Sequence, residues 1–113
     1  MNSIFRYVIA AALMLTGLTA SAEALKIVDS KKVCMVTNKL YSAAQIPVQV
    51  EGKTYYGCCE MCKETLATDV KARQAVDPVS KKTIDKAKAV IAARPDGSVV
   101  YFENRDNVAK FKD

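Results

Sequence analysis

Residues 46–66 read IPVQVEGKTYYGCCEMCKETL, and this stretch decides the fold of the first half of the chain. Residues 46–50 alternate and are rich in β-branched side chains, which is typical of a strand. Glu51-Gly52 is a turn signal, and residues 53–56 predict the returning strand. From residue 60 to residue 76 the composition favours helix, with Met61 and Leu66 towards the core and a break at Thr68-Asp69. The stretch therefore predicts a β-hairpin followed by helix.

A second segment repeats this order of features. It reads DPVSKKTIDKAKAVIAARPDGSVVYFENRDNVAKF and covers residues 77–111. A shift of 45 positions brings Gly52 onto Gly97 and places both aromatic strands in register. RPDG at 94–97 is a strong turn signal, and Asn104 is a good N-cap for a helix that begins after it.

We therefore predict an α+β fold made of two tandem small ββα units, each a β-hairpin followed by a helix. The expected boundaries are 23–75 for the first unit and 76–113 for the second. The cysteines do not repeat, so the fold of the second unit does not depend on them. With the shift of 45, Cys58 lies opposite Glu103, Cys59 opposite Asn104 and Cys62 opposite Asn107, and aligning KVCM with PVSK places Cys34 opposite Ser80.

The first residues have the pattern of a secretory signal peptide. Arg6 supplies the positive charge, residues 8–18 form an apolar run too short to span a bilayer, and Ala20-Ser21-Ala22 is an A-x-A cleavage site. We expect residues 1–22 to be a signal peptide and the mature protein to be periplasmic, with no membrane segment after cleavage.

Composition argues against several functional classes. The chain carries a net charge of +5, but its lysines are scattered and no basic patch with interleaved aromatic residues occurs, so nucleic-acid binding is not expected. There is no His and no Trp, and the sequence holds no glycine-rich phosphate loop and no pair of carboxylates at a telling spacing. We therefore do not expect an enzyme.

The four cysteines allow three interpretations. In a small secreted protein they suggest disulfides, although three thiols within five positions limit the possible bridges. Cys59 and Cys62 also form a C-x-x-C pair, which is the spacing of redox motifs, but no βαβ pattern surrounds it. The third interpretation is a metal site, because Cys58 at the end of a strand and Cys62 in the first turn of a helix can face one point, with Cys34 arriving from the other side.

The residues also indicate which metals suit such a site. Zinc sites usually mix cysteine with histidine, and histidine is absent. Thiolate and thioether ligands favour Cu(I), and Met35 lies beside Cys34 as Met61 lies beside Cys62. Core packing explains Met61 as well as a ligand role does, and it is the less favoured explanation for Met35.

The spacing C34-x23-C58-x3-C62, with YYGCC ahead of the last two cysteines, resembles the TRASH domain and the related YHS domain. The second segment, with its DPV opening and aromatic strand, resembles a YHS unit without cysteines. The resemblance implies small treble-clef-like modules concerned with heavy-metal trafficking, resistance or sensing. It also implies that Cys34, Cys58 and Cys62 are the metal ligands, with Cys59 and Met35 as further candidates.

Taken together, the sequence predicts a periplasmic heavy-metal-binding protein that serves as a carrier, buffer or resistance factor. Cu(I) is the expected cargo, and Zn(II) or another soft heavy metal is the alternative. The expected protein partner is one that exports or receives the metal. The alternative function is a disulfide-stabilised periplasmic interaction module that binds no metal.

Overall fold

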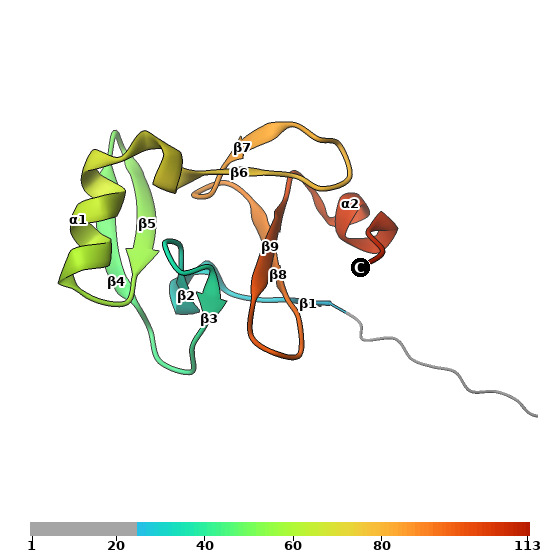
Figure 1. Ribbon diagram of the computed structural model, residues 1–113, viewed down its shortest axis with the longest axis horizontal. Helices are drawn as coiled ribbons and strands as arrows, with labels where there is room; N and C mark the ends of the chain where they lie inside the picture. Colours follow the sequence, from blue (N-terminus) through green and yellow to red (C-terminus); the bar gives the residue numbers. More distant parts are fainter. Residues whose placement is uncertain (1–24) are drawn as a thin grey trace, which may run out of the picture.

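The structure is a computed structural model that describes residues 25–113, and the predicted signal peptide at 1–22 lies outside this range. Strands and short helices follow one another along the described chain (Figure 1). In chain order the elements are β1 (Lys26–Ile27), the 3₁₀ turn η1 (Ser30–Lys32), β2 (Val33–Cys34), β3 (Lys39–Leu40), β4 (Ile46–Val50), β5 (Lys53–Gly57), α1 (Glu60–Thr68), η2 (Val70–Arg73), β6 (Gln74–Val76), β7 (Thr83–Asp85), β8 (Val90–Ala93), β9 (Val99–Phe102) and α2 (Arg105–Lys110).

The first predicted hairpin is present as β4 and β5, paired antiparallel with Val48 opposite Tyr55. Glu51 and Gly52 both have positive φ, 52° and 80°, which is the geometry of a two-residue type I′ turn. Val48 and Tyr55 are both buried, and α1 lies along the hairpin (Figure 1). The sequence pattern at 46–66 therefore gives the expected hairpin and helix.

The second predicted hairpin is β8 and β9, and β1 adds a third antiparallel strand beside β8. Its turn uses Gly97 at φ 93°, with the Gly97 N–H donating to the Arg94 carbonyl at 2.9 Å. Helix α2 follows, and the Asn104 side chain accepts from the Asn107 N–H at 2.8 Å, so the predicted N-cap is confirmed.

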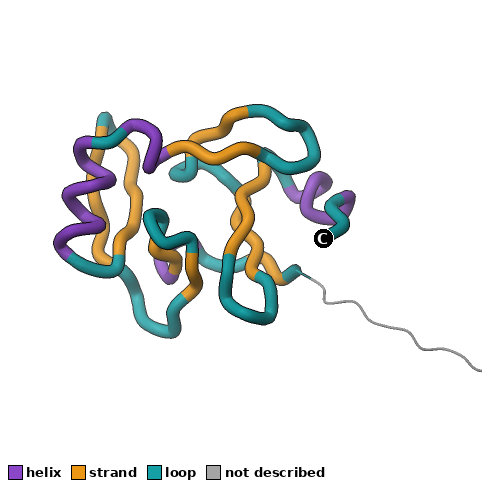
Figure 2. Tube along the Cα trace, in the orientation of Figure 1, coloured by secondary structure: helices purple, strands orange, loops and turns teal. Residues whose placement is uncertain are grey.

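Two short hairpins precede these elements and were not predicted: β2 with β3, and β6 with β7. Each turns through one non-glycine residue in the left-handed region, Asn38 at φ 57° and Lys81 at φ 67°. The described chain therefore contains four small antiparallel sheets, which Figure 2 separates by colour from the helices and loops.

One apolar cluster combines residues from both halves of the chain, so the two halves pack against each other directly. Backbone hydrogen bonds cross between them as well, from Leu40 N–H to Gly97 O at 2.8 Å and from Val99 N–H to Asn38 O at 3.0 Å. The buried members of the cluster are Val33, Met35, Val48, Tyr55, Leu66, Ile91, Ala93, Val99 and Tyr101.

The predicted α+β class is confirmed, with two local corrections. The break at Thr68-Asp69 is present, but the expected second helix is only the 3₁₀ turn η2, and residues 74–76 form strand β6 instead. Asp69 starts that turn by accepting from the Lys71 N–H at 3.0 Å, which favours a tight turn over a continued helix. Met61 was expected in the core, and this is wrong, because the residue is 76% exposed on α1.

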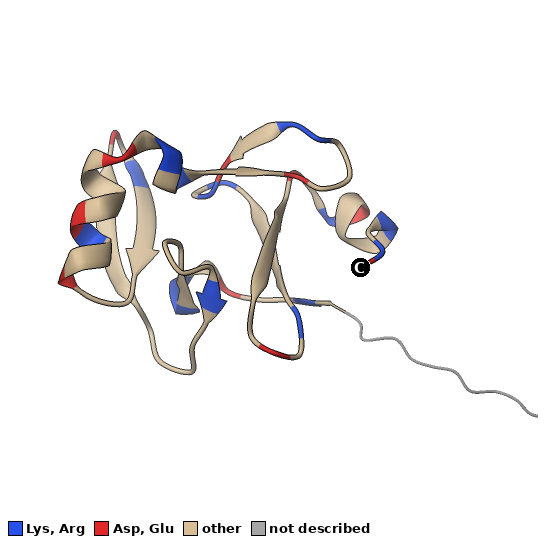
Figure 3. Cartoon of the chain, viewed as in Figure 1, with Lys and Arg blue, Asp and Glu red and all other residues tan. Residues whose placement is uncertain are grey.

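The distribution of charge and the length of the helices both bear on function. Lysine and arginine residues are spread over many elements, with acidic residues between them along the chain (Figure 3). Among the described residues, no helix has the length and apolarity needed to cross a membrane.

Candidate metal centre

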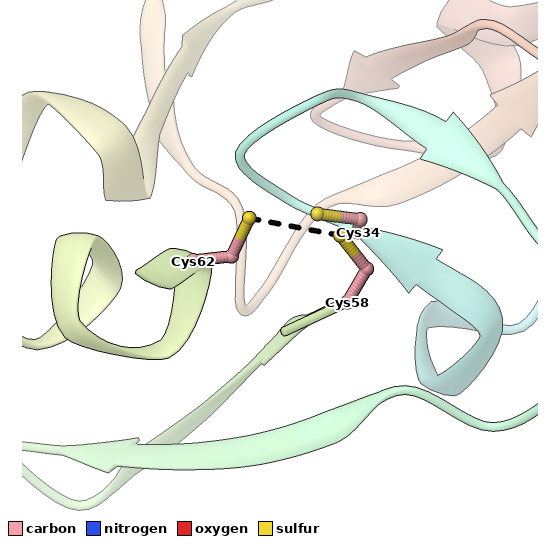
Figure 4. A group of neighbouring side chains, drawn as sticks. All are labelled: Cys34, Cys58 and Cys62. Carbon is pink, nitrogen blue, oxygen red and sulfur yellow. Dashed lines mark hydrogen bonds between the residues drawn. The ribbon is translucent and has the colours of Figure 1, made fainter. Parts of the chain in front are cut away.

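Three cysteine sulfurs meet where the end of β2, the end of β5 and the first turn of α1 come together. The Sγ atoms of Cys34, Cys58 and Cys62 all lie within 4.8 Å of one another, and those of Cys58 and Cys62 are 3.7 Å apart (Figure 4). All four cysteines of the chain are free thiols in the structure. The fold therefore brings together the three cysteines that were predicted from the sequence as ligands.

Each thiol is delivered by a different element. Cys34 ends β2, and the turn behind it is closed by the Asn38 N–H donating to the Cys34 carbonyl at 2.8 Å. Cys58 directly follows β5, and Cys62 lies in the first turn of α1. The thiols therefore come from a strand end, a strand-to-helix corner and a helix, and these are held by separate hydrogen-bond patterns.

Gly57 allows the corner to be this tight. A Cβ atom at residue 57 would lie 3.0 Å from the Cβ of Cys62, closer than side chains normally approach. The glycine in YYGCC therefore lets the end of β5 approach the first turn of α1, and this approach places Cys58 and Cys62 side by side.

The environment of Cys34 favours its thiolate. Burial raises the pKa of this thiol, but hydrogen bonds from Thr37 and from the backbone N–H groups of Val36 and Cys58 outweigh burial and lower the pKa from 9.0 to about 7. The Thr37 N–H lies 3.5 Å from the Cys34 sulfur. A turn of N–H groups around a buried sulfur is therefore the first feature that prepares this site to hold an anion.

The other two thiols of the cluster hold their protons more tightly. Burial raises the pKa of Cys62 to about 12, and neighbouring thiols add to the effect. The hydrogen bond with Cys34 raises the pKa of Cys58. Three thiols this close cannot all ionise against one another without a cation between them, so metal binding here must displace protons.

Cys59 lies outside the group of three. It is exposed and is the N-cap residue of α1. The backbone N–H of Cys62 lowers the pKa of its thiol, as expected for a thiol at a helix N-terminus. Its position suits contact with solvent or with an approaching molecule better than a place inside the cluster.

The two methionines beside the thiols are in opposite environments. Met35 is fully buried and belongs to the apolar cluster of the core, so its packing is explained without a ligand role. Met61 is exposed on α1. The geometry brings the three cysteines together, and it gives Met35 a place in the core.

A buried lysine that sequence reasoning missed lies beside the Cys34 turn. Lys86 is 5% exposed, and its Nζ donates to the Met35 carbonyl at 2.6 Å and to the Asn38 side-chain oxygen at 3.0 Å. The Tyr101 hydroxyl donates to the same Asn38 oxygen at 2.8 Å. The surrounding sequence, IDKAKAV, reads as an ordinary charged surface, so no local signal marks this residue.

The second half has a corner of the same form without thiols. The Lys81 N–H donates to the Asp77 carbonyl at 2.8 Å, as the Asn38 N–H does to that of Cys34. Asp77 is therefore the counterpart of Cys34, and the predicted pairing of Cys34 with Ser80 is wrong. The sequence shift is 43 positions at this corner and 45 at the following hairpin, which a single ungapped alignment cannot represent.

No family model, no curated protein and no solved structure matches the chain.

Proposed function

We propose that the protein binds one soft metal ion through Cys34, Cys58 and Cys62. The observation that carries this proposal is the convergence of three sulfur atoms, from three separate elements, within 4.8 Å of one another. A metal–sulfur bond of about 2.3 Å places neighbouring sulfurs roughly 3.8–4.0 Å apart. The Cys58–Cys62 separation of 3.7 Å is close to that value, so small movements of the third thiol suffice.

Cu(I) is the proposed ion. Three thiolates without histidine or carboxylate in the group form a soft donor set, which suits Cu(I). Zn(II) prefers four ligands in structural sites, and the group supplies three. Zn(II) would need a fourth donor from outside this group of three, such as a water molecule.

The wider proposal follows from the resemblance to metal-trafficking modules and from the arrangement of the chain. We assign a cleaved signal peptide at 1–22, a periplasmic location and a role as metal carrier, buffer or resistance factor without enzymatic activity. Two tandem ββα units, of TRASH and YHS type, would then comprise a metal-binding unit and a cysteine-free partner. A metal-exporting or metal-receiving protein would dock where Cys58 and Cys59 are exposed.

Titration of the reduced mature protein with Cu(I) against a competing chelator tests the proposal. The wild type should bind about one Cu(I) per chain, and Cys34→Ser, Cys58→Ser or Cys62→Ser should each lower the affinity at least about 100-fold, because serine replaces a soft sulfur with a hard oxygen. Cys59→Ser is the matched control, and it should change the affinity much less.

Each alternative gives a different pattern. A redox pair of Cys59 and Cys62 would make Cys59 essential and Cys58 dispensable. A disulfide module would show oxidised thiols in the exported protein and loss of stability in the cysteine variants. Failure of the wild type to compete for Cu(I), with its thiols shown to be reduced, would refute the metal site.

A further inference from the structure

Lys86 is a buried cation without an acidic partner. Within residues 25–113 the ion pairs are Lys53 with Asp85 and Arg94 with Asp113, and Lys86 is in neither. The neighbouring carboxylate, Asp85, bonds instead to Lys53 Nζ at 2.6 Å and to the Tyr55 hydroxyl at 2.8 Å. The contacts of the Lys86 ammonium are all to neutral groups: the Met35 carbonyl, the Asn38 amide oxygen and the Tyr101 ring, whose centre is 5.0 Å away.

Burying an ammonium group among neutral groups alone costs free energy of folding. An ammonium removed from water needs an opposite charge or a full set of strong acceptors, and neutral acceptors compensate it only in part. The Tyr101 hydroxyl does not supply that charge, because burial raises the pKa of Tyr101 and keeps it neutral. The group beside Lys86 that gains negative charge on metal binding is the thiolate cluster, through Cys34, which directly precedes Met35 in the chain.

We infer that Lys86 is the counter-charge of the loaded metal–thiolate centre, and that it favours a monovalent soft metal over a divalent one. This inference rests on the proposed function. Three thiolates around Cu(I) carry a net charge of −2, and the same three around a divalent ion carry −1. A fixed positive charge from the second half of the chain stabilises both complexes, and it stabilises the more negative one more.

The charge difference gives a quantitative expectation. At a fixed distance the interaction energy is proportional to the charge of the centre, and the Cu(I) centre carries one more negative charge than the divalent centre, whatever charge the empty site has. One unit of charge at a site of this kind corresponds to roughly tenfold in affinity. Removing the ammonium should therefore weaken Cu(I) binding about tenfold more than it weakens the binding of a divalent ion.

The experiment compares Lys86→Gln with Lys86→Arg in the Cys59→Ser background, so that no fourth thiolate can change the charge of one complex. Glutamine keeps hydrogen-bonding capacity without charge, and arginine keeps the charge. Cu(I) and Cd(II) affinities are measured by competition with chelators on the same reduced preparations. We expect Lys86→Gln to lose about tenfold more affinity for Cu(I) than for Cd(II), and Lys86→Arg to stay close to the parent for both metals.

The outcomes separate this inference from the proposed function. Equal losses for the two metals would show that Lys86 only positions the Cys34 turn, and no loss for either would show that its charge does not act on the centre; both results overturn the inference and leave the metal site intact. A parent protein with reduced thiols that binds neither Cu(I) nor Cd(II) refutes the proposed function, and the inference with it.

Folding of the variants is checked by circular dichroism without metal. Lys86→Met, which keeps the aliphatic length, is the second uncharged variant in case the glutamine side chain does not fit the site. Both uncharged variants should fold without metal, because the groups in contact with the ammonium are the neutral Met35 carbonyl, Asn38 amide and Tyr101 ring. If neither folds, Lys86 is required for the fold itself and the inference is wrong.

Discussion

The corners at Cys34 and Asp77 have the same backbone form and opposite chemistry. In both, a strand end is followed by a tight turn through one left-handed residue, Asn38 or Lys81. The helices that face the corners also begin alike, with N-cap angles of φ −157° and ψ 175° at Cys59 and φ −157° and ψ 173° at Asn104. The second half thus shows how this corner is closed when no metal is needed.

At the second corner one carboxylate takes the place of the three thiols. Asp77 Oδ1 accepts from the backbone N–H groups of Val79 and Ser80 at 2.7 and 3.1 Å. Its Oδ2 accepts at 2.8 Å from the Glu103 N–H and from the Asn107 side chain. Glu103 and Asn107 stand where Cys58 and Cys62 stand in the first half, so the same positions are joined by hydrogen bonds within the chain. In the first half, the proposed metal ion would join the corresponding residues Cys58 and Cys62 to Cys34.

The two corners therefore differ in what they need to be stable. The Asp77 corner is closed by hydrogen bonds within the chain, and the Cys34 corner contains three adjacent thiols. The Asp77 carboxylate finds all of its hydrogen-bond donors within the chain, so this corner contributes to folding without any ligand. The Cys34 corner leaves three thiols together, which gain most from a cation that neutralises them. The proposed role as a metal carrier would require this difference, because the chain would have to remain folded when the site is empty.

The largest expected effect on stability is therefore at Asp77. Asp77→Ala removes a fully buried carboxylate and leaves four N–H donors without their acceptor, so the free energy of unfolding should fall by about 3 kcal/mol or more. Urea denaturation of the reduced, metal-free protein measures this change.

Cys34→Ser is the matched change at the first corner. Because serine keeps an acceptor near the Thr37 N–H, it should cost the metal-free protein about 1 kcal/mol or less. Equal losses for the two variants would break the comparison, since both corners would then be structural to the same degree.

The sequence predicted the features that depend on repeated local signals. The hairpin at 46–57 follows from alternation and a glycine turn, the start of α2 follows from Asn104, and the approach of Cys58 to Cys62 follows from their spacing across the strand-to-helix corner. Each of these signals lies within a few residues of the structure that it specifies.

The missed features depend on contacts between distant residues. Strands of two or three residues, such as β2 and β6, are too short to show a period, so the hairpins at both corners left no pattern. Helix-favouring residues at 74–76 were drawn into a strand by pairing with β7. Lys86 reaches Met35 across 51 positions of sequence, and composition cannot distinguish it from the solvated lysines around it.

Acid is expected to have an intermediate effect on the free energy of unfolding. This effect arises at the Asp77 corner, which is closed by a carboxylate, and not at the Cys34 corner. Burial raises the pKa of Asp77, but hydrogen bonds from Asn107 and from the N–H groups of Glu103, Ser80 and Val79 outweigh it and bring the pKa from 3.8 to about 2. The unfolded chain therefore binds more protons than the folded chain in this range. The stabilisation by Asp77 should be complete above a pH of about 4 and should be lost as the pH falls from 3.8 through about 2.

Asp77→Asn removes this titration and isolates it from the other carboxylates. The difference in unfolding free energy between the wild type and Asp77→Asn should shrink as the pH is lowered through this window. Protonation of Asp77 should lower the free energy of unfolding less than Asp77→Ala does, because a protonated carboxyl still accepts through its carbonyl oxygen. A difference that is constant between pH 5 and pH 2 would show that the Asp77 carboxylate is not stabilised by its N–H donors.

A smaller effect than at Asp77 is expected from Gly57, which lies where β5 leads into α1. Its counterpart in the second half is Phe102, which is fully buried and stacks edge-on against Phe111 with ring centres 5.6 Å apart. The second corner has room for a large side chain there, whereas at Gly57 even a methyl group would meet the Cys62 Cβ at 3.0 Å. Gly57→Ala should therefore cost about 1–2 kcal/mol of stability through overpacking.

The same substitution should move Cys62 away from Cys58 and so weaken Cu(I) binding, while Ala67→Gly on the exposed side of α1 serves as a control that perturbs the helix without touching the cluster. Chelator competition measures the affinity, and urea denaturation of the metal-free protein measures the stability of both variants. If Gly57→Ala binds Cu(I) as tightly as the wild type, the close approach of β5 and α1 is a requirement of packing alone. If its loss of affinity exceeds that of the control, the glycine is present because three sulfurs must meet at one ion.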